Sequence, residues 1–381
     1  MDFTLTPELL AIQDLVSKFV DREFTPLEDE IDAADDVDPL LMAELRRKAV
    51  GIGLYAFNLP AELGGAGLGA LGEVVIGEET GRTSMPLSET VGRLPQSVIF
   101  ATAEQREWLV GPLVRAERTA CVALTEPDAG SDLGGIRTRA VRSGDKWVLN
   151  GSKTFISNAS TSDYIFVLAV TNPQAPLRDR LTVFVVDRDQ LQGIHGFRKL
   201  GWRGYHISSF SLDNCMLDSG RVLGEVHGGF ATMMASINRT RLYIASRCVG
   251  AARELLRLGV EHAGLRTTFG KTLASHQAIQ FMLADIDVEL EAARMLTYQA
   301  AWKVDQGAPD ARIAVSRAKL YASEMAGRAA DTVLQVYGGA GFMADHPVER
   351  FYRDLRGYRI GEGSSEMQRI QIGRSLLAQK A

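Results

Sequence analysis

A single carboxylate stands between two glycines near the end of the chain, in the segment Gly361-Glu362-Gly363. Glycines on both sides leave no neighbouring side chain to shield the carboxylate, and they let the backbone approach a ligand closely. A carboxylate held in this way could act as a general base at the wall of a pocket. The same pattern is typical of an exposed turn between two helices, and the segment alone favours that simpler interpretation.

Two earlier segments carry groups that could bind a flat, polar ligand. The loop LTEPDAGSD, residues 124–132, predicts a tight turn whose amides and hydroxyls (Thr125, Ser131) could bind polar atoms. In the segment NGSKTFISNA, Phe155 and Ser157 are two residues apart, so on one strand they face the same side. Each segment is also compatible with a purely structural role, as a turn and as a half-buried strand.

The C-terminal part offers two further candidates, RTTFGK from Arg266 and QVYGGAGF from Gln335. A guanidinium group can bind phosphate through two hydrogen bonds, and the pair Gly338-Gly339 would let the backbone approach a ligand. The alternatives are a surface arginine and a glycine that ends a helix.

Composition and spacing argue against several classes of function. A net charge of −5 over 381 residues is not typical of a nucleic-acid-binding protein. The six histidines show no paired ligand spacing, so no metal site is expected. No apolar run approaches the roughly 20 residues that cross a bilayer, and the N-terminal residues 1–4 do not begin a signal peptide. The three cysteines form no CxxC pair, which is typical of a reducing compartment, so we expect a cytoplasmic protein without a membrane segment.

Three regions that differ in their residue pattern must position these candidate residues. Residues 1–120 place apolar side chains at helical spacing, and residues 121–223 alternate β-branched and aromatic runs with turn residues. In the second region, Asn150-Gly151 between two such runs predicts a hairpin turn. Residues 224–381 return to the helical period, with long helices and short connections. The order predicts a multidomain α+β protein with a helical, a β and a second helical domain.

Taken in order, the segments resemble those of the acyl-CoA dehydrogenase family. The resemblance implies an N-terminal all-α domain, a middle antiparallel β-domain and a C-terminal four-helix-bundle domain. It also implies FAD between the last two domains and a homotetramer built as a dimer of dimers. It rests on six stretches spread over nearly the whole chain, namely NLPAELGGAGL (58–68), LTEPDAGSD (124–132), NGSKTFISNA (150–159), RTTFGKTLASHQAIQFMLADI (266–286), QVYGGAGF (335–342) and RFYRDLRGYRIGEGSSEMQR (350–369).

The resemblance implies α,β-dehydrogenation of an acyl-CoA thioester to the trans-2-enoyl-CoA, with electrons passed to an electron-transferring flavoprotein. By family position, Glu362 abstracts the α-proton while flavin N5 accepts the β-hydride. Because the α-proton of a thioester is weakly acidic, the site must polarise the carbonyl, exclude water and raise the pKa of the base. The backbone N–H of Glu362 and a ribityl hydroxyl would donate to that carbonyl.

Family position also assigns residues to the cofactor and the substrate. Cofactor-binding positions within one chain are Val122, Leu124, Thr125, Ser131, Phe155, Ile156, Ser157, Ser364, Ser365 and Glu366. Positions that would reach the FAD of a neighbouring subunit are Arg266, Phe269, Gln277, Gln335, Val336, Gly338 and Gly339. Substrate-binding positions are Ser131, Asn238, Arg241 and Gly363.

The chain departs from the family pattern at several of these places. Phe155 stands where many members have Trp, and Asp128 replaces a frequent Gly, which disfavours a positive φ there. Gly361 replaces a frequent Tyr beside the base and would open the pocket. Some relatives carry the base on an earlier helix, where this chain has Thr240, so Glu362 is the only credible base.

Two other interpretations of the whole chain stay open, and the acyl group is not predicted. The protein could use oxygen directly, as an acyl-CoA oxidase does, or it could be a non-catalytic scaffold with the same fold. Arg93 and Gln96 hint at a polar floor of the acyl pocket, although we expect a surface position for both.

Overall fold

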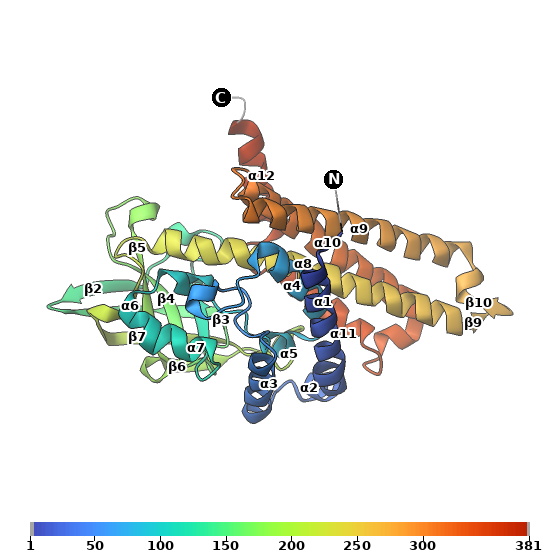
Figure 1. Ribbon diagram of the computed structural model, residues 1–381, viewed down its shortest axis with the longest axis horizontal. Coiled ribbons are helices and arrows are strands. Elements are labelled where there is room, and N and C mark those ends of the chain that lie inside the picture. Colours follow the sequence, from blue (N-terminus) through green and yellow to red (C-terminus); the bar gives the residue numbers. More distant parts are fainter. Residues whose placement is uncertain (1–3, 379–381) are drawn as a thin grey trace.

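The computed structural model describes residues 4–378, so part of the prediction for the N-terminal residues 1–4 lies outside the described range. A helical N-terminal part lies against a β-sheet and against a bundle of long helices that extends away from the sheet (Figure 1). In the described part of the chain, no helix is both long and apolar enough to cross a membrane.

The N-terminal part is built from short helices around one deeply buried helix. Helix α4 (Gly69–Thr80) packs against the bundle, and Val74, Val75 and Ile76 are fully buried. The same helix buries the carboxylates of Glu73 and Glu78, which therefore need cationic partners. The other helices are α1 (Pro7–Phe19), α2 (Glu28–Ala34), α3 (Pro39–Gly51), α5 (Met85–Glu89), α6 (Ala103–Gln105) and α7 (Gly111–Val114).

The β-sheet follows the order β6-β7-β3-β2-β4-β5-β8 and is mostly antiparallel, with β1 parallel to β4. Strand β4 (Tyr164–Val170) is buried on both faces. Phe166 and Leu168 pack against the N-terminal helices, whereas Ile165 and Val167 belong to the sheet's own core. The other strands are β1 (Ala120–Ala123), β2 (Arg139–Ser143), β3 (Lys146–Ser157), β5 (Leu181–Asp187), β6 (Gln192–Gly196), β7 (Ile207–Asp218) and β8 (Val222–Leu223).

The hairpin predicted at Asn150-Gly151 is wrong. Both residues lie inside the continuous strand β3, at a break in its register with β7. A side chain at Gly151 would come within 2.4 Å of Thr138 Oγ1, so glycine is needed for close packing and not for a turn. The true hairpin joins β2 to β3 through Gly144, whose φ is 64°.

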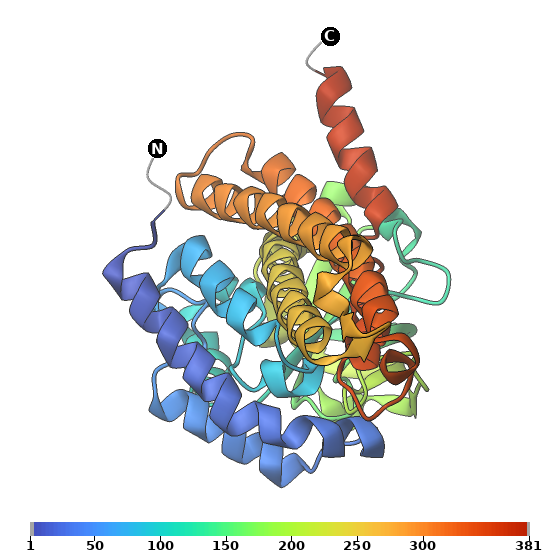
Figure 2. The same ribbon diagram turned by 90° about the vertical axis from the view of Figure 1, so that its right-hand side faces the viewer.

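The C-terminal part consists of three long helices, α8 (Gly229–Leu265), α9 (Gln277–Asp305) and α10 (Ala311–Tyr337), with α11 (Val348–Tyr358) packed on α8 and α10. The small ribbon of β9 (Thr267–Thr268) and β10 (Lys271–Thr272) lies at the end of the bundle farthest from the sheet (Figure 1). Helix α12 (Ser365–Ala378) stands clear of the body in Figure 2, and the turn that leads into it carries Glu362.

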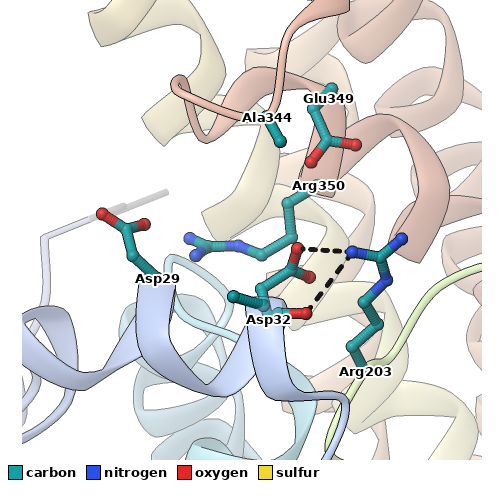
Figure 3. A pocket seen from close by; sticks show the side chains of 7 residues that line it. Asp29, Asp32, Arg203, Ala344, Glu349 and Arg350 are labelled. Carbon is teal, nitrogen blue, oxygen red and sulfur yellow. Dashed lines mark hydrogen bonds and ion pairs between the residues drawn. The ribbon is translucent and has the colours of Figure 1, made fainter.

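A group of charged side chains, here called the α2–α11 cluster, joins helix α2 to helix α11. Arg353 donates hydrogen bonds to both Asp32 (2.9 Å) and Glu349 (2.8 Å). Arg203 also donates to Asp32, at 3.3 Å, as Figure 3 shows. The bond from Arg353 lowers the pKa of Glu349. Asp32, Arg203 and Glu349 of the cluster line a small hollow that contains none of the predicted site residues, so we regard the cluster as structural.

Candidate active site

Glu362 occupies a strained turn between α11 and α12. Its φ is 55°, in the left-handed region that non-glycine residues rarely adopt. The next residue, Gly363, has a φ of 87°, and a Cβ there would lie 2.8 Å from Arg241 Nη2. Glycine is therefore required at Gly363 both by conformation and by space.

The backbone carbonyls of this turn are held by three buried side chains from three helices. Arg241 of α8 donates from Nε to the Glu362 carbonyl at 2.8 Å. Lys319 of α10 and Gln368 of α12 both donate to the Gly363 carbonyl, at 2.9 and 2.8 Å. Because these donors are buried and converge on the backbone, they fix the turn without occupying the carboxylate. We call this arrangement the base turn.

The Glu362 carboxylate itself makes no hydrogen bond or ion pair with residues 4–378. The surrounding protein raises its pKa by withdrawing it from bulk water, an effect that outweighs the lowering by Arg241, Arg93 and Lys319. The side chain nevertheless keeps solvent-accessible surface in the single chain, so a ligand can reach it. A carboxylate that is accessible, unpaired and more basic than usual is suited to remove a proton.

The predicted substrate residues on α8 and in the base turn lie together, whereas Ser131 does not join them. Asn238 accepts a hydrogen bond from Arg241 at 3.3 Å, and Arg241 lies against Gly363. Ser131 is exposed in the loop after β1 and has no hydrogen bond to these residues.

On the sheet side, the two predicted cofactor segments are bound to each other. The Thr154 N–H donates to the Thr125 carbonyl at 3.0 Å. Lys153 is fully buried and donates to the Leu124 carbonyl (2.9 Å) and to Glu126 (2.8 Å). The buried ion pair therefore fixes the loop of Leu124 and Thr125 beside strand β3.

Phe155 is displayed by a bulge in β3 rather than by a regular strand. The register with β7 breaks between Lys153 and Ile156, and Phe155 has a φ of 56°. Its ring is 63% exposed and lies 5.1 Å from that of Phe197. Ile156 is buried in the sheet core, so only its backbone is available to a cofactor, whereas Ser157 and Val122 are half-buried. An exposed aromatic face beside the half-buried hydroxyls of Thr125 and Ser157 fits a flat, polar-edged ring system such as flavin.

The second group of predicted cofactor residues lies at the opposite end of the molecule. Arg266 directly precedes β9, and Phe269 lies in the turn between β9 and β10, where it is 93% exposed. Gln277 begins α9, and Gln335, Gly338 and Gly339 are exposed at the end of α10, while Val336 is buried. The ribbon of β9 and β10 lies at the opposite end of the molecule from the sheet that contains β3 (Figure 1), so within one chain these residues do not meet the sheet-side segments. Their assignment to a neighbouring subunit's cofactor stays a prediction.

Three predicted cofactor residues follow the base. Ser364 is half-buried, and Ser365 is buried and donates to Glu324 at 2.7 Å. Glu366 is exposed in the first turn of α12. The hydroxyl of Ser365 is thus already used inside the protein.

Several site residues were not predicted from the sequence. Lys319 had one visible signal, because Ser316, Lys319 and Ser323 place polar groups at helical spacing within an Ala-rich run and all are buried. The surface position expected for Arg93 is wrong, since its side chain is only 8% exposed. Gln96 is half-buried and accepts a hydrogen bond from Asn58 at 3.0 Å.

Models of the N-terminal, middle and C-terminal domains of acyl-CoA dehydrogenase match residues 6–117, 121–215 and 227–377 of this chain. The chain belongs to the acyl-CoA dehydrogenase family. Members of this family are FAD enzymes that act on the CH–CH bond of acyl-CoA, and membership confirms the predicted family and three-part fold. The individual site residues and the domain limits stay predictions.

Similar proteins cover almost the whole of this acyl-CoA dehydrogenase chain. The 3-(aryl)acrylate reductase of Clostridium sporogenes is 36% identical over 385 residues, covering 99% of this chain and 100% of that protein. The structure of butyryl-CoA dehydrogenase from Megasphaera elsdenii has a TM-score of 0.91 at 30% identity, covering 99% and 100% of the two chains. A glutaryl-CoA dehydrogenase from Mycobacterium smegmatis in complex with FADH2 has a TM-score of 0.89 at 27% identity, covering 99% and 96%.

Proposed function

We propose that the protein is an FAD-dependent acyl-CoA dehydrogenase that converts an acyl-CoA thioester to the trans-2-enoyl-CoA, with Glu362 as the base. The observation that carries this proposal is that the buried donors of the base turn bind its backbone and not its carboxylate. Arg241 binds the carbonyl of Glu362 and leaves its carboxylate without a partner in the described chain. The raised pKa of Glu362 brings the carboxylate closer to the basicity that removal of an α-proton needs.

The backbone of the base turn would also bind the thioester. The N–H of Glu362 donates to no acceptor within residues 4–378, so it is free to donate to the thioester carbonyl oxygen. A donor at that oxygen stabilises the negative charge that develops when the α-proton leaves. Proton removal by the Oε atoms and carbonyl polarisation by the N–H would thus come from one residue. Asn238, Arg241 and Gly363 would line the acyl thioester, and Ser131 the CoA arm.

The exposed Phe155 ring and the hydroxyls of Thr125 and Ser157 would hold the flavin, with Val122, Leu124, Ser131 and the backbone of Ile156 beside it. FAD, when bound, supplies the acceptor for the β-hydride. Ser364, Ser365 and Glu366 would border the cofactor on the other side. Because Arg266, Phe269, Gln277 and residues 335–339 lie far from these groups, we propose that they complete the site of a second subunit in a homotetramer, a dimer of dimers.

An electron-transferring flavoprotein is the acceptor that we propose for the electrons. We also propose that the three functional parts divide at residues 120/121, one residue into β1, and at residues 223/224, where β8 ends.

Anaerobic mixing of the FAD-loaded protein with straight-chain acyl-CoAs tests this function. We expect the flavin absorbance to bleach and the trans-2-enoyl-CoA to be found by mass spectrometry. Rapid reoxidation on admission of air, without an electron-transferring flavoprotein, would identify an oxidase instead. A purified protein that is colourless and takes up no FAD would support a non-catalytic scaffold.

A further inference from the structure

A buried guanidinium group near the base has donors without acceptors. Arg93 follows helix α5, and its Nη1 donates to Thr240 Oγ1 of α8 at 3.0 Å. Its Nε and Nη2 are buried and find no hydrogen-bond acceptor in residues 4–378. A buried donor without an acceptor is costly, so such a group in a functional cleft indicates a missing ligand or water.

Arg93 lies within electrostatic range of the base. Its charge is one of three that lower the pKa of Glu362, and its hydrogen-bond partner Thr240 directly precedes Arg241, which holds the base turn. The guanidinium also stacks over the ring of Tyr243, with 5.2 Å between Cζ and the ring centroid. These contacts give Arg93 a fixed position within electrostatic range of Glu362, where an acyl group would be bound.

The carboxylates around Arg93 leave its buried donors without acceptors. Arg93 and Arg239 lie beside Glu73, and Arg93 and Arg247 are within electrostatic range of Glu89. Glu73 binds Arg239 directly, and its other oxygen is 3.6 Å from Arg93 Nε, too far for a hydrogen bond. Glu89 has no ion pair in the described chain, and burial raises its pKa. Nη1 of Arg247 is also buried without an acceptor. Arg93 and Arg247 therefore both keep buried donors that the neighbouring carboxylates do not satisfy, and such donors require a further acceptor.

We propose that Arg93 binds a carboxylate at the far end of the acyl group, so that the preferred substrates are CoA monothioesters of dicarboxylic acids. Nε and Nη2 form one edge of the guanidinium group, which matches the two oxygens of a carboxylate. The carboxylate would supply the hydrogen-bond acceptors that Glu73 and Glu89 do not give to Arg93. This inference rests on the proposed function, because it assumes that the thioester lies at Glu362.

Matched pairs of substrates test the proposal in the holoenzyme. Hexanoyl-CoA and adipoyl-CoA have six-carbon acyl groups and differ in the terminal methyl or carboxylate, and octanoyl-CoA and suberoyl-CoA form a longer pair. In at least one pair we expect kcat/KM of the wild-type protein to be about 10- to 100-fold higher for the carboxylate member, the range of a hydrogen bond to a charged group. Arg93→Met should abolish this preference, because kcat/KM should fall far more for the carboxylate member than for the methyl member, while FAD content is kept.

Arg253→Met is the matched control, because Arg253 pairs with Glu78 and Glu79 away from the base turn. It should keep the wild-type preference. Arg93→Lys keeps the charge but loses the two-donor edge, so its preference should be intermediate.

The outcomes separate this inference from the proposed function. If no acyl-CoA reduces the flavin, the proposed function fails. If methyl-ended acyl-CoAs are oxidised as well as their carboxylate partners at both lengths, only the inference about Arg93 fails. An equal loss for both members in Arg93→Met would make Arg93 a structural partner of Glu73, which also overturns it. Should that variant not fold, the wild-type preference alone decides.

Discussion

The base turn and the α2–α11 cluster use the same residue types in opposite ways. In the α2–α11 cluster, Arg353 binds the carboxylates of Asp32 and Glu349 directly. In the base turn, Arg241 and Lys319 bind backbone carbonyls, and the carboxylate of Glu362 is left alone. The pKa of Glu349 is lowered by its arginine, whereas that of Glu362 is raised by its surroundings.

The difference shows how one protein separates stability from reactivity. A carboxylate with a lowered pKa stabilises the folded state at neutral pH, and one with a raised pKa destabilises it there. Because Arg241 and Lys319 bind backbone carbonyls, the base turn stays in place. The carboxylate of Glu362 therefore keeps the basicity that proton removal needs. Substitutions at Glu362, Lys319 and Glu349 test the two halves of this contrast.

The largest effect is expected from Glu362→Gln, which removes the base but keeps the size of the side chain. Turnover should fall about 10²- to 10⁴-fold, the usual contribution of a general base, while FAD and acyl-CoA binding are retained. Stopped-flow bleaching of the flavin measures the loss. Glu30→Gln, at an exposed position of helix α2, is the control. Bleaching at a near wild-type rate in Glu362→Gln would refute the assignment of the base.

Lys319→Met loosens the base turn without touching the carboxylate. Because Gly363 then keeps only the bond from Gln368, we expect kcat to fall about 10- to 100-fold through displacement of the base, with KM little changed. Steady-state kinetics measures the split between kcat and KM, with the surface variant Lys146→Met as control. Equal changes in both variants would show that the bond to Gly363 does not position the base.

Glu349→Gln should affect stability and not chemistry. The lowered pKa of Glu349 means that its contribution is fully present above its unfolded pKa, near 4.5, and is lost as pH falls through the folded pKa. We expect a loss of about 1–3 kcal/mol at pH 7 that shrinks below pH 4.5. Urea unfolding at pH 7 and at a pH below 4.5 measures this loss in the free energy of unfolding. A loss independent of pH would assign the effect to packing.

The smallest effect is expected on stability, where Glu362→Gln should act in the opposite direction to Glu349→Gln. The raised pKa of Glu362 gives a contribution that is present below the unfolded pKa, near 4.5, and lost as pH rises through the folded pKa. At pH 7 the ionised group therefore costs stability, and its replacement should raise the melting temperature slightly. Differential scanning calorimetry at pH 7 and pH 4.5 would show the rise only at the higher pH. A lower melting temperature of Glu362→Gln than of the wild-type protein at pH 7 would contradict the contrast between Glu362 and Glu349.

Features with a local signature could be predicted from the sequence. The period of apolar residues predicted long helices after residue 224, where the structure has α8, α9 and α10. Glycines on both sides singled out Glu362, and the turn residues singled out the loop of Thr125. These signals depend on residues that are neighbours in the chain, so one sequence contains them in full.

Features that depend on partners distant in the chain could not be predicted. Arg93 looked like a surface residue because nothing near it in sequence shows that Tyr243 and Thr240 cover it. Asn150-Gly151 has the composition of a hairpin turn, but the close approach of Thr138 decides its conformation. The same holds for Lys319, whose role depends on where the turn after α11 places a carbonyl.

The two glycines beside the base are unequal in what the backbone demands of them. Gly363 has no room for a side chain, whereas Gly361 has an ordinary φ, and an added Cβ would meet only the Gly357 carbonyl oxygen at 3.6 Å. Residue 361 can therefore change without rebuilding the turn. If residue 361 borders the acyl group, as the resemblance to the family implies, a single-codon change there gives natural selection or directed evolution a route to a new acyl specificity while the catalytic geometry is inherited intact.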